Sequence, residues 1–350
     1  MEYDFKLDEC RYTPSISTVR IEGDKKNNFW SSDSYFRYNA ALISYFYGKE
    51  HYNYRKYFDY SEDFYLMADS GAIQFINSNK PMEPERVFNW MNRNTNCGLV
   101  CDYIPGKVQT GNYEKKAFDE CMTLSKSNYL VARKKRDFKL YTCIHGNNFS
   151  DLDRWYKNTS EGLEFDGIAL PVSANLDIIT TLLCWSLTKR KEYKNYHFLT
   201  GSGIQSIALI FYTKTLFPFF TFDSSSPYIK ARRYAEFDLP FFLKSMAIGN
   251  KKNDIKIKSP CNCPVCKKTP FEEFTKSAGR DGKFGGNKLA LHNLYNFLSF
   301  TKLLSSFADD RDFYKSFIKL CIPNVFPYIE KIDNFLKGKE ITTQRSVNEW

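Results

Sequence analysis

Short apolar runs alternate with longer helix-like segments along most of this chain. The runs are 40–46 (AALISYF), 64–69 (FYLMAD), 97–102 (CGLVCD), 138–144 (FKLYTCI), 165–170 (FDGIAL), 196–200 (YHFLT) and 217–223 (FPFFTFD). The segments between them carry apolar residues at intervals of three and four, which is the period of an amphipathic helix. Near-continuous apolar strands separated by helices are typical of a parallel sheet that is buried on both faces.

Seven such runs predict a (β/α)8 TIM barrel rather than an open doubly wound sheet, and they leave the eighth strand to be found. Residues 15–23 (SISTVRIEG) are a candidate for an N-terminal strand that closes the barrel floor. No glycine-rich GxGxxG or Walker-type loop follows the first run, which argues against a nucleotide cofactor. We expect the barrel over 1–255, an inserted zinc-binding subdomain over 256–300 and a C-terminal helical part over 301–350, with its helices at 311–337.

Three of the apolar runs end in aspartate, at Asp69, Asp102 and Asp223. Residues at the C-terminal ends of barrel strands line the active site of this fold. A single strand-end aspartate is usually a turn or helix-cap residue, but three at one rim indicate chemistry. One carboxylate can attack an electrophilic carbon while another moves a proton, which suits transfer or hydrolysis at a glycosyl carbon.

A cluster of three cysteines is followed by a distal histidine: Cys261, Cys263, Cys266 and His292. Three thiols in a polar loop that contains prolines are not typical of a packed core. Together with the imidazole they complete a tetrahedral set of ligands for Zn²⁺, and four protein ligands leave no open position, so the zinc would be structural. We interpret the other seven cysteines as buried free thiols in a reducing compartment.

The chain carries a formal net charge of +10, with basic runs at 132–136, 230–233 and 251–258. Such runs are usually solvated faces, but clustered lysines and arginines also bind phosphates. Residues 35–60 are rich in tyrosine and phenylalanine, which we interpret as packing, with base stacking as the alternative. The N-terminus lacks a secretion signal and no apolar run approaches the roughly 18 residues of a membrane span, so we expect a cytoplasmic protein without membrane contact.

Several motifs resemble those of the tRNA-guanine transglycosylases and their DNA-modifying relatives, which insert 7-deazaguanine bases. The similar stretches are 68–75 (ADSGAIQF) to Asp-Ser-Gly-Gly-Phe-Gln, 99–105 (LVCDYIP) to Phe-Asp-Glu-Cys, 197–203 (HFLTGSG) to Leu-Met-Gly-Val-Gly, and 220–227 (FTFDSSSP) to Phe-Asp-Cys-Val-Leu-Pro. CNCPVC and LHNL match the zinc signature of the family in residue type and spacing. The motifs occur in the order of the family and cover about two-thirds of the chain.

The resemblance implies a role for each matching residue. Asp223 would be the nucleophile that attacks C1′ and expels guanine, Asp69 the general acid and base, and Asp102 the carboxylate that reads the amino-pyrimidinone edge of the base. The target base must leave its stack to reach such a pocket. The other residues that would surround the base are Ser70, Gly71, Gln74, Gly201 and Gly203.

The chain departs from the family pattern at three places. CIHGN stands where the family has Val-Gln-Gly-Gly, so that His145 takes the place of a base-reading glutamine, and LPVSA (170–174) replaces a Gly-Gly-Leu loop. SPYIKARR replaces the Pro-Thr-Arg that follows the nucleophile, with Lys230, Arg232 and Arg233 as candidate contacts to a nucleic-acid backbone.

Because the aspartates and zinc ligands persist while the polynucleotide-facing motif differs, we favour the DNA-modifying branch. The predicted reaction is exchange of guanine in DNA for a 7-deazaguanine base of the preQ0 type. The same exchange in tRNA is the alternative, followed by a non-catalytic nucleic-acid-binding subunit and a base hydrolase. The resemblance also allows a homodimer.

Overall fold

The computed structural model of this chain describes residues 4–16, 28–78, 80–105, 118–172, 175–199, 203–232, 235–237, 245–247, 261–270 and 288–339. For residues 230, 232, 235–237 and 245–247 it describes the backbone only. The chain forms two compact units. The first consists of Met1–Ala41, Phe58–Tyr65 and Ser224–Ser306, and the second of Leu42–Tyr57, Leu66–Asp223 and Phe307–Trp350.

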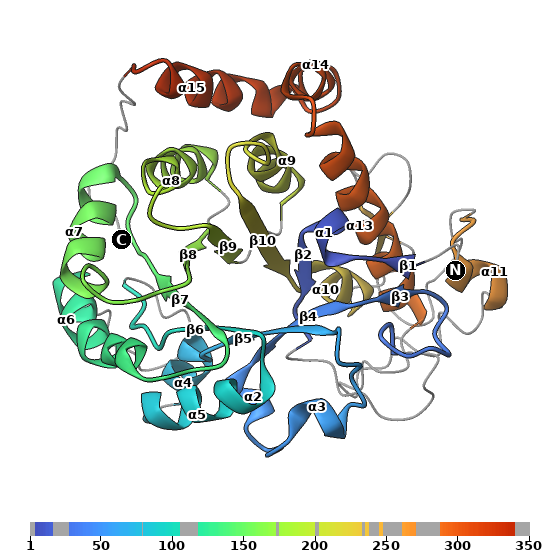
Figure 1. The fold of residues 1–350 in the computed structure, drawn as a ribbon. Helices are drawn as coiled ribbons and strands as arrows, with labels where there is room; N and C mark the ends of the chain where they lie inside the picture. Colours follow the sequence, from blue (N-terminus) through green and yellow to red (C-terminus); the bar gives the residue numbers. More distant parts are fainter. Residues whose placement is uncertain are drawn as a thin grey trace. The chain divides into compact units, whose positions relative to one another are not determined.

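Eight strands form one sheet in the order β2-β10-β9-β8-β7-β6-β5-β4, which closes almost completely into a barrel (Figure 1). Helices alternate with most of these strands along the chain. The strands are β2 (Tyr12–Pro14), β4 (Ala40–Ser44), β5 (Tyr65–Asp69), β6 (Cys97–Leu99), β7 (Lys139–Cys143), β8 (Gly167–Pro171), β9 (Asn195–Leu199) and β10 (Phe219–Ser224). All neighbouring pairs from β5 to β10 are parallel. The predicted (β/α)8 barrel class is therefore confirmed.

Each of the seven apolar runs overlaps a barrel strand, because a strand buried on both faces needs apolar residues at consecutive positions. The eighth strand is β2, which lies just ahead of the predicted candidate at 15–23. Only Ser15 and Ile16 of that candidate are described, and residues 17–23 lie outside the described part of the chain. A three-residue strand is too short to give a periodic pattern, which explains why the sequence alone left the eighth strand to be found.

Helices of the second unit follow the strands of the barrel (Figure 1). They are α2 (Tyr45–Gly48), α3 (Tyr54–Tyr57), α4 (Ala72–Asn77), α5 (Pro84–Asn94), α6 (Phe118–Tyr129), the 3-10 helix η2 (Leu130–Arg133), α7 (Phe149–Thr159), α8 (Leu176–Thr188) and α9 (Ile204–Tyr212). Asn148 and Asn175 cap α7 and α8, since their side chains accept hydrogen bonds from backbone N–H groups of the first turn. Gly167 is required in β8, because a Cβ there would lie 2.5 Å from the carbonyl oxygen of Asn195 in β9.

The C-terminal segment of the second unit is helical, as predicted for 311–337. It contains α14 (Arg311–Cys321), the 3-10 helix η3 (Pro323–Val325) and α15 (Phe326–Leu336). The buried hydroxyl of Tyr314 donates to the carbonyl oxygen of Ala208 in α9 at 2.8 Å. Asp333 in α15 accepts from Arg311 at 3.0 Å and Lys315 at 2.6 Å, so that one carboxylate ties α15 to α14.

The first unit carries the N-terminal elements and the long helix α13. Its elements besides β2 are β1 (Asp4–Phe5), α1 (Leu7–Cys10), β3 (Arg37–Tyr38), α10 (Ser226–Arg232), β11 (Ala235–Phe237), β12 (Ser245–Ala247), α11 (Pro264–Lys268) and α13 (Lys288–Phe307). The predicted domain boundary at 255 lies outside the described residues, and the one at 300 falls within α13. Among the helices that the structure describes, none combines the length and apolar character that a membrane crossing requires.

Candidate functional site

Three aspartates lie at the carboxyl ends of barrel strands in the second unit. Asp69 is the last residue of β5, and Asp223 is the last but one of β10. Asp102 follows β6, which ends at Leu99, earlier than the apolar run suggested. The charges of Asp102 and Asp223 both act on the carboxyl group of Asp69, so the three residues share one electrostatic environment.

The Asp69 carboxyl group is the most perturbed acid of this site. Its placement within the protein leaves the charged form poorly solvated and raises its pKa from 3.8 to about 7. The backbone N–H of Gly71 donates to its Oδ1 at 3.2 Å and opposes this rise, while the negative charges of Asp102 and Asp223 add to it. A carboxyl group with a pKa near neutrality can both give and accept a proton at physiological pH.

The variant Asp69→Asn is expected to be more stable than the wild type above about pH 7. Because the folded-state pKa lies above the unfolded-state value of 3.8, the stability that this group contributes is fully present below that value and is lost as the pH rises through about 7. The amide does not ionise, so its advantage should grow from near zero at acid pH to at most about 4 kcal/mol at alkaline pH.

Thermal unfolding of both proteins between pH 4 and pH 9 measures this effect. Asp137→Asn is the matched control, since Asp137 is exposed and lies outside the barrel rim. A stability difference for Asp69→Asn that does not vary with pH would contradict the raised pKa.

Asp102 forms a buried pair with His145. The Nε2 atom of His145 lies 2.6 Å from Oδ2 of Asp102, and the two side chains are only 3% and 8% exposed. The imidazole packs edge-on against Trp155, with ring centroids 4.6 Å apart. Trp155 in turn donates from Nε1 to the carbonyl oxygen of Cys143 at the end of β7. The structure thus brings two predicted site residues together and fixes the orientation of the Asp102 carboxylate.

Asp223 lies beside a histidine that sequence reasoning did not single out. The Nε2 atom of His197 lies 3.5 Å from Oδ1 of Asp223, and its Nδ1 lies 2.8 Å from the hydroxyl oxygen of Thr221. His197 is fully buried. His197 on β9 is the register partner of Thr221 on β10. Because side chains alternate along a strand, Thr221 and Asp223 point to the same side of β10, and His197 faces both. Only strand register reveals this relation; the sequence shows His197 between two aromatic residues.

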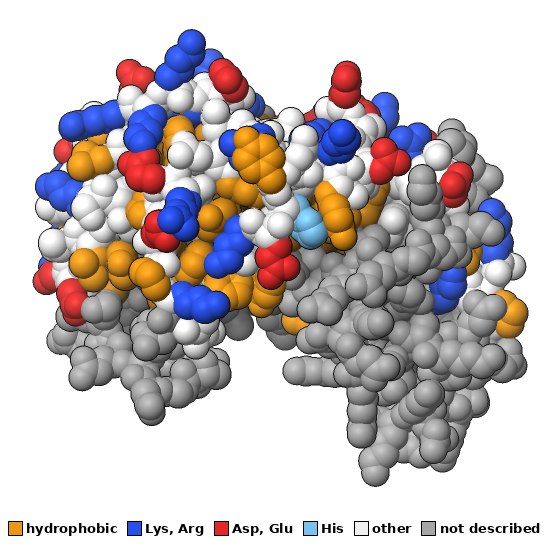
Figure 2. Space-filling view, turned by 90° about the horizontal axis from the view of Figure 1, so that it is seen from below, with side chains coloured by type: hydrophobic (Ala, Val, Ile, Leu, Met, Phe, Trp, Pro, Cys, Tyr) orange, Lys and Arg blue, Asp and Glu red, His pale blue; other side chains and the backbone are white. Residues whose placement is uncertain are grey.

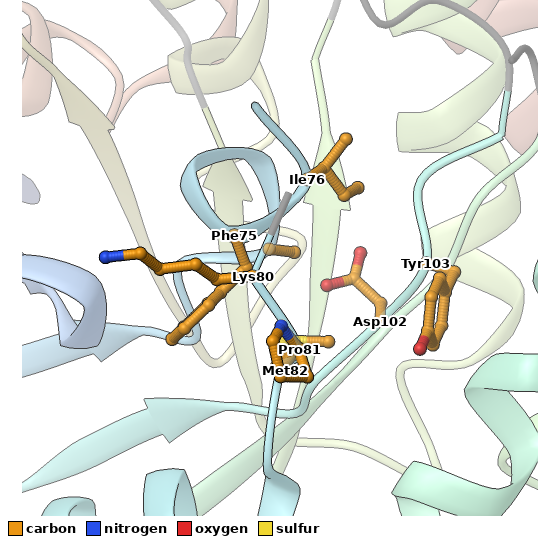
Figure 3. Close-up of a pocket in the computed structure, with 8 residues that line it drawn as sticks. Phe75, Ile76, Lys80, Pro81, Met82, Asp102 and Tyr103 are labelled. Atoms are coloured by element: carbon orange, nitrogen blue, oxygen red, sulfur yellow. The ribbon is translucent and has the colours of Figure 1, made fainter. Parts of the chain in front are cut away.

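A cavity of about 340 Å³ opens beside Asp102. Its lining consists of Ala72, Phe75, Ile76, Lys80, Pro81, Met82, Asp102 and Tyr103. The Asp102 carboxylate points into the space between Ile76 and Met82, with the Tyr103 ring on one side and Lys80 on the other (Figure 3). The volume lies at the lower end of the range for small-molecule sites, and a lining of mixed polar and apolar groups with a carboxylate acceptor suits a flat polar heterocycle.

The remaining predicted pocket residues have mixed outcomes. The Ser70 hydroxyl is buried and forms no hydrogen bond among the described residues. Gln74 accepts from the Ser44 hydroxyl at 3.3 Å. Gly71 has φ of +81°, and a Cβ there would lie 2.9 Å from Phe46 Cβ, so the chain itself already requires a glycine. Gly203 precedes α9 and is exposed.

Four predicted contact residues cannot be placed by their side chains. Gly201 and Arg233 lie outside the described residues, and only the backbone of Lys230 and Arg232 is described, within α10.

The first unit holds a compact cluster of metal-ligating side chains. The ligand atoms of Cys261, Cys263, Cys266 and His292 all lie within 4.8 Å of one another. The Nδ1 atom of His292 faces the thiols, at 3.5 Å from Cys263 Sγ and 3.1 Å from Cys266 Sγ. Hydrogen bonds from Cys263 and Cys266 hold the pKa of the Cys261 thiol well below its usual range. The four residues that were predicted from their spacing therefore form a group that could bind a metal ion.

Surrounding groups orient this cluster. The backbone N–H groups of Cys263 and Cys266 donate to Cys261 Sγ and Cys263 Sγ at 3.4 and 3.3 Å. The side-chain amide nitrogen of Asn296, one helical turn after His292, lies 3.1 Å from the Nε2 atom of His292. An imidazole that binds a metal through Nδ1 carries its proton on Nε2, so we expect the Asn296 amide to rotate and its oxygen to accept a hydrogen bond from Nε2 when metal is bound. The sequence could have indicated Asn296, because it follows His292 by four residues and therefore lies on the same face of α13.

The cysteines outside the cluster are free thiols. Six of them are buried, as predicted: Cys10, Cys97, Cys101, Cys121, Cys143 and Cys184. Cys321 is partly exposed, because it is the last residue of the surface helix α14.

No protein-family model matches this chain, and no curated protein is significantly similar to it.

Proposed function

We propose that this protein is a transglycosylase that exchanges guanine in DNA for a 7-deazaguanine base of the preQ0 type. The observation that carries the proposal is the meeting of Asp69, Asp102 and Asp223 at one end of the barrel, with the pKa of Asp69 raised to about 7. The motif resemblance to the tRNA-guanine transglycosylases supports the same roles. A base-sized cavity beside Asp102 supplies the space for the reacting heterocycle.

In the first half of the reaction, a carboxylate oxygen of Asp223 attacks C1′ of the flipped nucleotide. The bond from C1′ to N9 of guanine breaks, and an ester between C1′ and Asp223 forms. Asp69 in its protonated form donates the proton that the leaving guanine takes up. His197 lies beside Oδ1 of Asp223, and its own ring is positioned by Thr221.

In the second half, the incoming base replaces guanine. Asp69, now ionised, accepts the N9 proton of the incoming base while that nitrogen attacks C1′. The ester bond breaks and the Asp223 carboxylate is regenerated, so no cofactor is consumed. A pKa near 7 suits both halves, because the same group must be an acid in the first and a base in the second.

Asp102 is proposed to bind the amino-pyrimidinone edge that guanine and 7-deazaguanines share. A carboxylate accepts hydrogen bonds from the two N–H donors of this edge. The hydrogen bond from His145 to Oδ2 holds the carboxylate in place and leaves each oxygen a lone pair for the base. His145 thus supports base reading through Asp102.

We also propose that the cluster of Cys261, Cys263, Cys266 and His292 binds Zn²⁺. Three thiolates and one imidazole are a donor set that zinc prefers in tetrahedral geometry. Four protein ligands leave no position for substrate, so the metal would stabilise the first unit and take no part in the chemistry. When bound, it would hold the short helix α11 against α13.

Incubation with radiolabelled guanine tests the proposed reaction. The wild type is expected to incorporate label into DNA, and excess preQ0 should chase that label out. Label in unmodified tRNA and none in DNA would support the tRNA alternative. Release of free guanine and an abasic product without an acceptor base would identify a hydrolase, and absence of both incorporation and release would overturn the proposal of an enzyme.

A further inference from the structure

Two lysine ammonium groups meet at one aromatic ring at the edge of the Asp102 cavity. Lys49 Nζ lies 4.6 Å from the ring centroids of both Phe46 and Phe75, and Lys80 Nζ lies 6.0 Å from the centroid of Phe46. Phe75 and Lys80 also line the cavity. Cation–π contacts hold the two charges near the ring, although both lysines are exposed.

Neither of these lysines forms an ion pair with a residue that the structure describes. Some basic side chains elsewhere are compensated: in the run 132–136, Lys134 pairs with Glu85 and Arg136 with Asp166. On the face shown in Figure 2, lysines and arginines are interspersed with acidic side chains. Glu83, next to the cavity residue Met82, is paired with Arg86 at 2.8 Å. The pair Lys49 and Lys80 therefore concentrates uncompensated positive charge at the cavity edge.

We infer that Lys49 and Lys80 form a binding site for a phosphodiester group of the polynucleotide whose base occupies the cavity. The inference rests on the proposed function, and it places a contact to the polynucleotide backbone at the edge of the cavity. Two positive charges close to one ring raise the local positive potential, and a phosphate near them would lower it. Lysine ammonium groups bind phosphate as point charges with adaptable geometry.

The arrangement of the cavity favours this occupant. In Figure 3 the Lys80 side chain extends away from Asp102, on the opposite side of the cavity from Tyr103. A nucleotide whose base directs its polar edge to the Asp102 carboxylate would leave its charged backbone outside the cavity. Asp102 itself disfavours an anion in the cavity, so the phosphate belongs at the rim. All these residues lie in the second unit.

The double variant Lys49→Gln/Lys80→Gln tests the inference through binding to a fluorescent single-stranded DNA oligonucleotide. Each lost phosphate contact should reduce the salt dependence of binding, by about 0.7 in the slope of log affinity against log salt concentration. Because the two lysines share one phosphodiester, the affinity ratio of wild type to double variant is expected to be roughly 2.6 times larger at 50 mM than at 200 mM salt. Fluorescence anisotropy titrations at the two concentrations measure it.

Lys126→Gln/Lys157→Gln is the matched control, because it removes the same charge from exposed positions on α6 and α7. An equal loss in the control pair, an unchanged salt slope in the rim variant, or no binding by the wild type would overturn the inference. The assay does not depend on catalysis. If the wild type exchanges bases and the Lys49→Gln/Lys80→Gln variant binds DNA as the wild type does, only the proposed phosphate site is wrong. If binding depends on the two lysines but no exchange occurs, only the proposed reaction is wrong.

Discussion

Replacement of Asp223 by asparagine is expected to reduce base exchange by at least about 10⁴-fold. A neutral amide oxygen is a poor nucleophile towards C1′, and the variant cannot form the ester between the sugar and the enzyme. The wild type incubated with DNA and without acceptor base should yield a covalent protein–DNA adduct that survives denaturing electrophoresis. The Asp223→Asn variant should yield none.

The matched control is Asp177→Asn, which alters an exposed aspartate of α8 that pairs with Lys331. It should exchange bases and form the adduct at the wild-type rate. Circular dichroism shows whether the Asp223→Asn protein is folded, which is expected because the change is isosteric. Adduct formation or wild-type turnover by the folded Asp223→Asn variant would exclude Asp223 as the nucleophile.

Loss of the metal site is expected to have the largest effect on stability. Structural zinc contributes on the order of 10 kcal/mol of apparent binding energy in small zinc-binding peptides, because an unfolded chain holds no preformed site. We expect the purified protein to contain one zinc ion per chain by atomic emission spectrometry. Cys263→Ser should lose most of that metal and lower the melting temperature, and a strong chelator should do the same to the wild type.

Cys321→Ser is the control, since this partly exposed cysteine lies outside the cluster. It should retain the full metal content and the melting temperature of the wild type. If Cys263→Ser keeps its zinc, or if the wild type purified with zinc in the medium carries none, the assignment of these ligands is wrong. A different bound metal would correct the identity of the ion and leave the ligand set in place.

The cluster of metal ligands illustrates what local spacing can predict. The ligands Cys261, Cys263 and Cys266 lie within six positions, so the short loop alone nearly determines their arrangement. Only His292 had to come from a distant helix. The strand-end positions of Asp69 and Asp223 were predictable for a similar reason, because each terminates an apolar run that a two-sided parallel sheet demands.

Pairs of residues from different elements were beyond the reach of such patterns. His197 lies beside Asp223 because β9 and β10 pair in one register, and a shift by one residue would turn His197 to the opposite face. Lys49 and Lys80 both lie near the ring of Phe46, which packs against Phe75 from a separate helix with ring centroids 5.1 Å apart. The sequence contains every one of these residues but no signal of their proximity.

The sequence by itself therefore determined the alternation of strands and helices, the barrel class and the set of candidate metal ligands. These features depend on burial and spacing over a few residues, which the order of amino acids expresses directly. The tertiary structure alone decided which histidine lies beside which aspartate and how far the pKa of Asp69 is raised. It also decided which lysines lie at the edge of the cavity. Those features depend on distances between side chains that are far apart in the chain, and only the closure of the sheet and the packing of its helices set such distances.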